Sequence, residues 1–134
     1  MRYLAIDYGT KRTGLAICDP SETIVSPLEV LRTDKGLIQK LSEIIKNENV
    51  GAIVVGLPLN MDDSHGYQTK IVMTFIEKLK ASMDIPVHLQ DERLSSFAAE
   101  EKLTDAGFDR REKSKRLDAI AAAEILKAFL NQDC

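Results

Sequence analysis

Hydrophobic and polar positions follow the period of strands in the first part of the chain. Two apolar runs, residues 3–6 and 14–18, open the sequence, and the polar stretch with Gly9 between them predicts a β-hairpin. A third run over 24–31 contains Pro27, which favours an edge strand because proline cannot donate a ladder hydrogen bond. The N-terminal part therefore predicts a three-stranded meander.

The rest of the chain alternates between the helical period and short strands. Residues 52–55 are apolar on both faces and β-branched, as in a buried parallel strand, and the more polar 86–90 predict a strand near an edge. Thr33 or Asp34 is expected to cap the first helix. The helices themselves are predicted over 37–45, 71–79, about 95–106 and about 113–131. This order predicts an α/β protein with a mixed five-stranded sheet and helices on both faces, the plan of the ribonuclease H-like fold.

Length and composition narrow the class of protein. A chain of 134 residues predicts a single domain over 1–134, and 44% hydrophobic residues are enough for an ordinary core. The net charge of −3 excludes a globally basic nucleic-acid coat but allows a local basic patch. No apolar run approaches the ~20 residues of a membrane span, and no signal peptide is recognisable. With two cysteines far apart, we expect a reducing, cytoplasmic location and no zinc site.

Carboxylates stand where strands end. Asp7 follows the first apolar run, Asp91 and Glu92 follow the last strand, and Asp118 shares a helical face with apolar residues. A carboxylate on an inward face is costly without a partner or a cation. If these acids converge, they would suit Mg²⁺ or Mn²⁺, and their repulsion should raise at least one carboxylate pKa. The alternative is that strand-ending aspartates only cap turns and Asp118 only pairs with a base.

Basic residues precede the last acid. The segment 110–116 holds five basic residues and one acid, and basic charge near a helix N-terminus opposes the helix dipole. We expect Arg110, Arg111, Lys113, Lys115 and Arg116 to bind a phosphate backbone, with Arg93 extending the patch. A solvated charged face is the alternative.

Two loops invite a phosphate-binding interpretation. The turn after Asp7, with Gly9 and Thr10, resembles the phosphate-binding hairpin of actin-like ATPases and sugar kinases, although those proteins need two such domains. Asn60 follows a buried strand, where it could orient a phosphate or a water, or simply belong to a loop that caps the next helix. His88 is interpreted as a strand residue without a catalytic role.

Four segments together resemble the YqgF or RuvX family of pre-16S rRNA nucleases, which are also described as Holliday junction resolvase-like. They occur in family order and span nearly the whole chain. The matching stretches are Asp7-Tyr8-Gly9-Thr10-Lys11 with Gly14 and Ala16, Val55-Gly56-Leu57-Pro58-Leu59-Asn60-Met61-Asp62, Asp91-Glu92-Arg93-Leu94-Ser95, and Asp118-Ala119 with Ala121-Ala122 and Ile125-Leu126.

The resemblance implies a ribonuclease H-like, metal-dependent nuclease that processes the 5′ end of pre-16S rRNA. Its acidic triad would be Asp7, one carboxylate of the Asp91-Glu92 pair, and Asp118. Strand alternation alone does not choose within the pair. We favour Glu92, with Asp91 as the alternative, because related resolvases use a glutamate at this position.

Several functions remain open at this point. Lys11 would neutralise the scissile phosphate of a structured RNA in the leading hypothesis, a nuclease with Mg²⁺ or Mn²⁺. A resolvase of branched DNA would need two active sites, and so a dimer, whereas the nuclease could be a monomer or a weak homodimer. A non-catalytic nucleic-acid-binding module for ribosome assembly would bind without cutting, and an ATPase-type half-domain would bind nucleotide.

Overall fold

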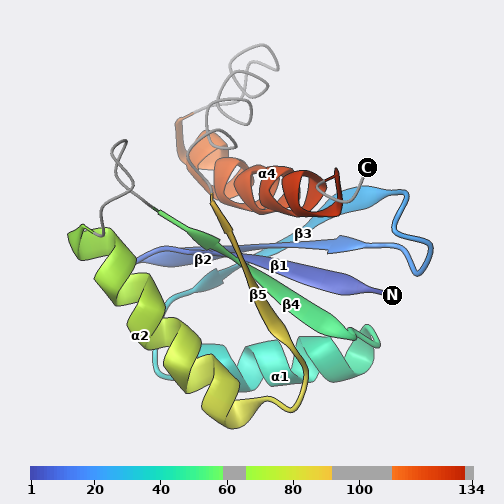
Figure 1. Cartoon of the computed structure of the whole chain (residues 1–134). Coiled ribbons are helices and arrows are strands. Elements are labelled where there is room, and N and C mark those ends of the chain that lie inside the picture. Colours follow the sequence, from blue (N-terminus) through green and yellow to red (C-terminus); the bar gives the residue numbers. More distant parts are fainter. Residues whose placement is uncertain (59–65, 92–109, 132–134) are drawn as a thin grey trace.

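The predicted order of strands and helices is confirmed for the residues that the structure describes. The computed structural model of the chain describes residues 1–58, 66–91 and 110–131, with side chains from Leu117 onwards in the last range. Its elements are β1 (Tyr3–Tyr8), β2 (Arg12–Cys18), β3 (Val25–Arg32), α1 (Leu37–Asn47), β4 (Ala52–Leu57), α2 (Tyr67–Ser82), β5 (Val87–Asp91) and α4 (Arg110–Leu130) (Figure 1). The helix predicted over about 95–106 lies outside the described residues.

The strands form one five-stranded mixed sheet. Its order is β3-β2-β1-β4-β5, with β1, β2 and β3 antiparallel in sequence and β4 parallel to both β1 and β5. The edge positions predicted for the third and last strands are therefore confirmed. The register of β2 and β3 shifts where Ala16 pairs with Pro27, so the proline sits beside a bulge of an edge strand, where its missing donor costs least.

Helices cover both faces of the sheet (Figure 1). Helices α1 and α2 lie on one side and α4 on the other. Alternation along β1 separates the two cores: Leu4 and Ile6 belong to the core under α1 and α2, whereas Ala5 packs with α4. On the α4 side the contacts are made by small residues of both partners, including Ala16 and Ala122, which let the helix approach the sheet closely.

One local prediction is wrong. Gly36, not Thr33 or Asp34, is the N-cap residue of α1, and no side chain caps the helix. Asp34 instead accepts a hydrogen bond from the Gly36 amide at 2.9 Å, and Thr33 is used by the β1–β2 turn. A tertiary contact of Thr33 thus replaced the local capping bond.

Candidate active site

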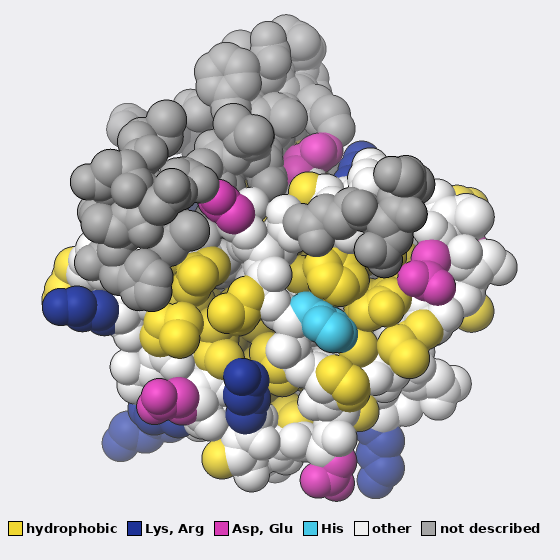
Figure 2. All heavy atoms as spheres, in the orientation of Figure 1, with side chains coloured by type: hydrophobic (Ala, Val, Ile, Leu, Met, Phe, Trp, Pro, Cys, Tyr) yellow, Lys and Arg dark blue, Asp and Glu magenta, His cyan; other side chains and the backbone are white. Residues whose placement is uncertain are grey.

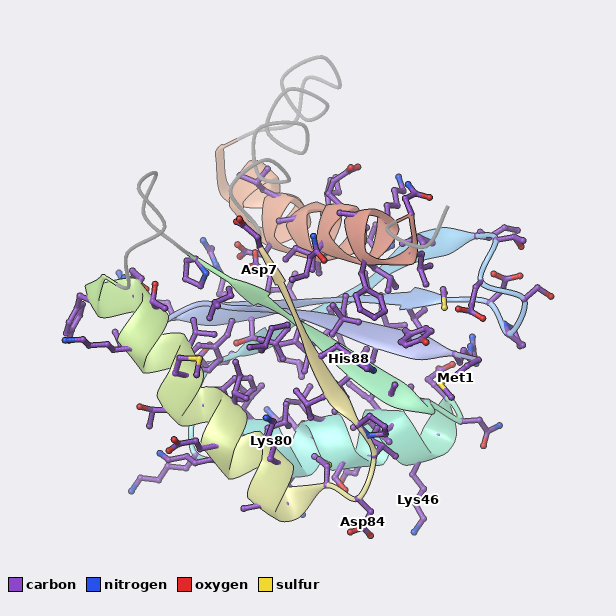
Figure 3. All side chains as sticks on the ribbon, viewed as in Figure 1. Met1, Asp7, Lys46, Lys80, Asp84 and His88 are labelled. Atoms are coloured by element: carbon purple, nitrogen blue, oxygen red, sulfur yellow. The ribbon has the colours of Figure 1, made fainter. Side chains whose placement is uncertain are left out.

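Asp7 and Asp118 come together through Gly14. Asp7 pairs with Gly14 across the β1–β2 ladder, and by alternation it lies on the same face as Ala5, toward α4. A methyl group on Gly14 would overlap the main-chain carbonyl of Asp118, so α4 rests directly on this glycine. Figure 3 labels Asp7 beside the N-terminal half of α4. Two acids far apart in the sequence thus flank one close helix–strand contact.

Arg12 makes the principal described contact of Asp118. Arg12 is the first residue of β2 and lies on the same face as Gly14, toward α4. Its Nε lies 3.1 Å from Asp118 Oδ2. The two groups form an ion pair that lowers the pKa of Asp118, and Oδ2, which is shielded from solvent, has no further hydrogen-bond partner among the described residues. The side chain of Asp118 is 28% exposed. Asp118 therefore presents a shielded carboxylate oxygen with acceptor capacity beyond its contact with Arg12.

Burial raises the pKa of Asp118 to about 6, the neighbouring Asp7 charge adds to the rise, and Arg12 opposes it. The expectation that one carboxylate of the cluster has a raised pKa is confirmed. Its cause differs from the expected one, because removal of the carboxylate from water outweighs repulsion by Asp7.

The raised pKa of Asp118 makes the stability of the protein depend on pH. Between about pH 4 and pH 6 the folded state binds more protons at this group than the unfolded state, so stability falls as pH rises and then levels off. In EDTA, Asp118→Asn should remove this fall and stabilise the protein by about 1–3 kcal/mol at pH 7. Urea denaturation at pH 4.5, 5.5 and 7 measures it, with exposed Asp84→Asn as the control for loss of one negative charge. Equal stability differences at all three pH values would contradict the prediction.

Asp91, at the end of β5, lies at the same end of the strands as Asp7 but faces the other side of the sheet. It pairs with Leu57, which packs against the core under α1 and α2, whereas Asp7 belongs to the α4 face. The other predicted acid, Glu92, lies outside the described residues, as do Arg93 and Asn60. The structure thus brings together two of the predicted acids and separates Asp91 from them.

The predicted basic residues are only partly described. Arg110, Arg111, Lys113, Lys115 and Arg116 form the first two turns of α4, and their side chains lie outside the described residues. Lys11 is exposed in the β1–β2 turn. On the face shown in Figure 2, the coloured Lys and Arg side chains are scattered rather than gathered.

A threonine pair that the sequence interpretation missed holds the β1–β2 turn. Thr33 Oγ1 donates to the Gly9 carbonyl at 2.7 Å and lies 2.7 Å from Thr13 Oγ1, which is buried. The Thr33 amide donates to the Lys11 carbonyl at 3.0 Å. These bonds fix the turn that carries Lys11 and Arg12. No local signal reveals them, but alternation back from Gly14 could have placed Arg12 on the face of the acids.

The donor set suits a hard divalent cation. Within the described residues no group of three acidic, histidine or cysteine side chains forms a complete metal site. The shielded Oδ2 of Asp118 with Asp7 beside it is nevertheless an oxygen-rich, negatively charged position of the kind that Mg²⁺ or Mn²⁺ occupies. The residues present therefore fit a divalent ion, with the third predicted ligand outside the described range.

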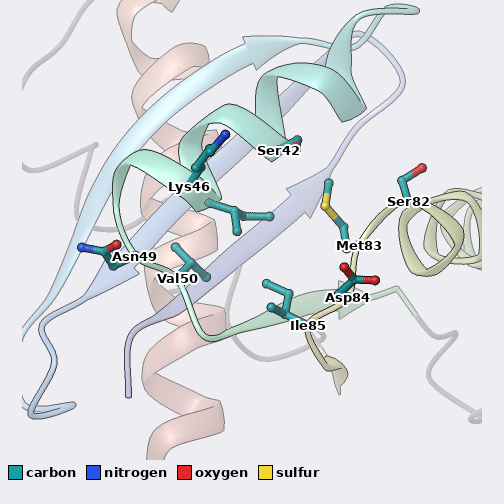
Figure 4. Close-up of a pocket in the computed structure, with 9 residues that line it drawn as sticks. Ser42, Lys46, Asn49, Val50, Ser82, Met83, Asp84 and Ile85 are labelled. Carbon is teal, nitrogen blue, oxygen red and sulfur yellow. The ribbon is translucent and has the colours of Figure 1, made fainter.

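Other features of the described structure lie away from these acids. A pocket of about 530 Å³ is lined by residues from the C-terminal parts of α1 and α2, such as Lys46 and Ser82, and from the segments that follow these helices, such as Asn49 and Asp84 (Figure 4). None of its lining residues is a predicted site residue. The ring of His88 lies among hydrophobic side chains (Figure 2), 5.2 Å from that of Phe129 and 6.3 Å from that of Tyr3, as expected for a strand residue. No helix within the described ranges is long and apolar enough to cross a membrane.

The fold is that of the ribonuclease H-like resolvases. The chain is similar to Thermus thermophilus RuvC in complex with a Holliday junction substrate, with a TM-score of 0.58 and 17% identity over 97% of this chain and 94% of that one. It is equally similar to the fowlpox virus resolvase bound to Holliday junction DNA, with a TM-score of 0.58 and 12% identity over 97% of both chains. At such identities the likeness concerns the fold alone.

Family membership follows from the sequence match. The model of the RuvX family, described as Holliday junction resolvase, matches residues 1–132, and the chain belongs to this family. A protein of Maridesulfovibrio salexigens named "Putative pre-16S rRNA nuclease" is 46% identical over 97% of this chain and 98% of its own length. A protein of the same name from Anaeromyxobacter sp. is 43% identical over 98% of this chain and 97% of its own length. The family indicated by the four segments is thus confirmed.

The alternative of an ATPase-type or sugar-kinase-like half-domain is supported only at the level of the fold. A ROK family protein from Streptococcus pneumoniae has a TM-score of 0.50 and 17% identity, and the match covers 81% of this chain but 40% of that one. The shared part reflects a common sheet plan.

Proposed function

We propose that the chain is a metal-dependent nuclease that hydrolyses phosphodiester bonds of structured RNA in 5′-end processing of pre-16S rRNA. The observation that carries the proposal is the shielded carboxylate oxygen of Asp118 beside Asp7, in a chain of the RuvX family. The names of the relatives support an rRNA substrate. The enzyme would act in the cytoplasm as a single domain, as a monomer or a weak homodimer.

Asp7, Glu92 and Asp118 would hold Mg²⁺ or Mn²⁺. The opposite facing of Asp7 and Asp91 supports Glu92, because successive residues of a strand alternate between faces. Two ions held in this way supply Lewis acidity for the attack of water and for departure of the 3′-oxygen. The chain's own contribution would be to hold Asp7 beside Asp118, at the cost of desolvating Asp118, before any ion arrives.

Basic and polar residues around the acids would bind the substrate. Lys11, exposed in the β1–β2 turn, would neutralise the scissile phosphate, and Asn60 and Arg93 would orient the neighbouring backbone. The basic residues of 110–116, in the turns of α4 that precede Asp118, would hold the flanking phosphates.

Replacing Arg110, Arg111, Lys113, Lys115 and Arg116 with Gln should weaken binding without changing the chemistry. The slope of log affinity against log salt should decrease by up to about 0.9 per lost phosphate contact on duplex DNA and about 0.7 on single strands. Cleavage at saturating substrate should change much less. Fluorescence anisotropy across a salt series measures the slope, and an unchanged slope would make these residues a solvated face only.

A cleavage assay tests the proposed function and its alternatives together. The wild-type chain is incubated with structured RNA and with a synthetic four-way DNA junction, with Mg²⁺, Mn²⁺ or EDTA, and Asp7→Asn is the control. Metal-dependent cutting of RNA supports the proposal. The junction is included because two resolvases of similar fold are bound to such junctions. Preferential cutting of the junction would support a resolvase. Binding without cutting in either metal would support a non-catalytic assembly module and overturn the nuclease.

A further inference from the structure

Arg12 occupies the side of Asp118 where a cation would bind. It stands two residues before Gly14 on β2, so alternation puts both on the face that α4 covers. Its Nε lies 3.1 Å from the Asp118 oxygen that is shielded from solvent and has no further partner among the described residues. The guanidinium therefore partly neutralises this oxygen from one side.

The two side chains of the Arg12–Asp118 pair differ in their exposure to solvent. The side chain of Arg12 is 43% exposed, whereas that of Asp118 is 28% exposed and carries the shielded oxygen. The half-exposed guanidinium can exchange this contact for water more readily than the shielded carboxylate oxygen can. Asp118 cannot move as easily, since its backbone rests on Gly14.

We infer that Arg12 is an exchangeable counter-ion of Asp118: a divalent cation displaces its guanidinium, which then binds a phosphate of the nucleic acid. This inference rests on the metal site of the proposed function. The released guanidinium lies next to exposed Lys11, on the turn held by Thr33, and its planar fork matches the two oxygens of a phosphate. Cation binding and substrate binding are thereby coupled through one side chain.

The first test is metal affinity without nucleic acid. Mn²⁺ alone is titrated calorimetrically into the full-length wild type, Arg12→Gln and Lys11→Gln. Loss of the competing guanidinium should tighten Mn²⁺ binding by roughly two- to fivefold in Arg12→Gln. Lys11→Gln removes the same charge from the neighbouring exposed residue and should change it less than about 1.5-fold because of screening. Unchanged or weaker Mn²⁺ binding by Arg12→Gln would overturn the exchange.

The second test is RNA affinity in EDTA and in Ca²⁺. Arg12→Gln should cost little affinity in EDTA, where Asp118 holds the guanidinium, and about tenfold in Ca²⁺, the value of a charge-assisted hydrogen bond. Lys11→Gln should lower RNA affinity by equal factors in EDTA and in Ca²⁺. Arg12→Lys, which keeps the charge without the fork, checks folding and should retain the wild-type Mn²⁺ affinity. Equal losses for Arg12→Gln in both buffers would overturn the exchange.

Wild-type cleavage separates this inference from the proposed function. If the wild type cuts RNA with metal but Arg12→Gln binds Mn²⁺ unchanged, the exchange fails and the nuclease stands. If Arg12→Gln binds Mn²⁺ more tightly but the wild type cuts nothing, the nuclease fails and the exchange stands.

Discussion

Asp7→Asn should abolish metal-dependent cleavage and leave the melting temperature in metal-free buffer equal to or slightly above that of the wild type. The amide has nearly the same volume but cannot supply a negative charge to a divalent ion. Its neutral side chain also relieves the repulsion that Asp7 exerts on Asp118. Activity and melting curves with EDTA and with Mg²⁺ measure both effects, and Mg²⁺ should raise the melting temperature of the wild type more than that of the variant.

Asp19→Asn is the matched control for Asp7→Asn. Asp19 Oδ1 accepts hydrogen bonds from the amides of Thr23 and Ile24, both at 2.7 Å, and these bonds lower the pKa of Asp19 to about 2. Because the charged form is favoured in the fold, losing the charge should lower the melting temperature and leave cleavage intact. If Asp7→Asn behaves in this way instead, the catalytic assignment of Asp7 fails and a turn-forming role replaces it.

Gly14→Ala should damage both stability and cleavage. The added methyl group would overlap the Asp118 carbonyl, so α4 must move away from β2. Overpacking of this kind typically costs about 1–3 kcal/mol, and backbone on backbone is the least compliant case. The displacement would also carry Asp118 away from Asp7, so we expect cleavage to fall by at least about tenfold even where the protein remains folded.

Gly36→Ala controls for the loss of a glycine. Its new methyl group would lie 3.4 Å from Asp34 Oδ1, close to an ordinary contact, in a backbone of φ −89°. Urea denaturation and the RNA cleavage assay on both variants decide the matter. A Gly14→Ala protein with wild-type stability and activity would show that α4 does not rest on this glycine.

Periodicity determined the elements and their edges. The meander of the first three strands, the buried strand over 52–55 and the edge strand with Pro27 were all predicted from local pattern, because side-chain period and proline's missing donor act within a few residues. The resemblance of four segments determined the family, which the match over 1–132 confirms. The sequence also placed Asp118 on the apolar face of its helix and Asp7 at the end of the first strand, from which convergence of the two acids was a hypothesis.

Only the tertiary structure decided how the acids are arranged. The contact of Gly14 with α4 sets Asp118 against Asp7, and the pairing of Asp91 with Leu57 turns Asp91 to the other face. Arg12 as the partner of Asp118, and burial as the main cause of its raised pKa, were not predicted. These properties depend on which backbone surfaces meet across the sheet and on how much water is excluded there, and neither quantity is local in the sequence.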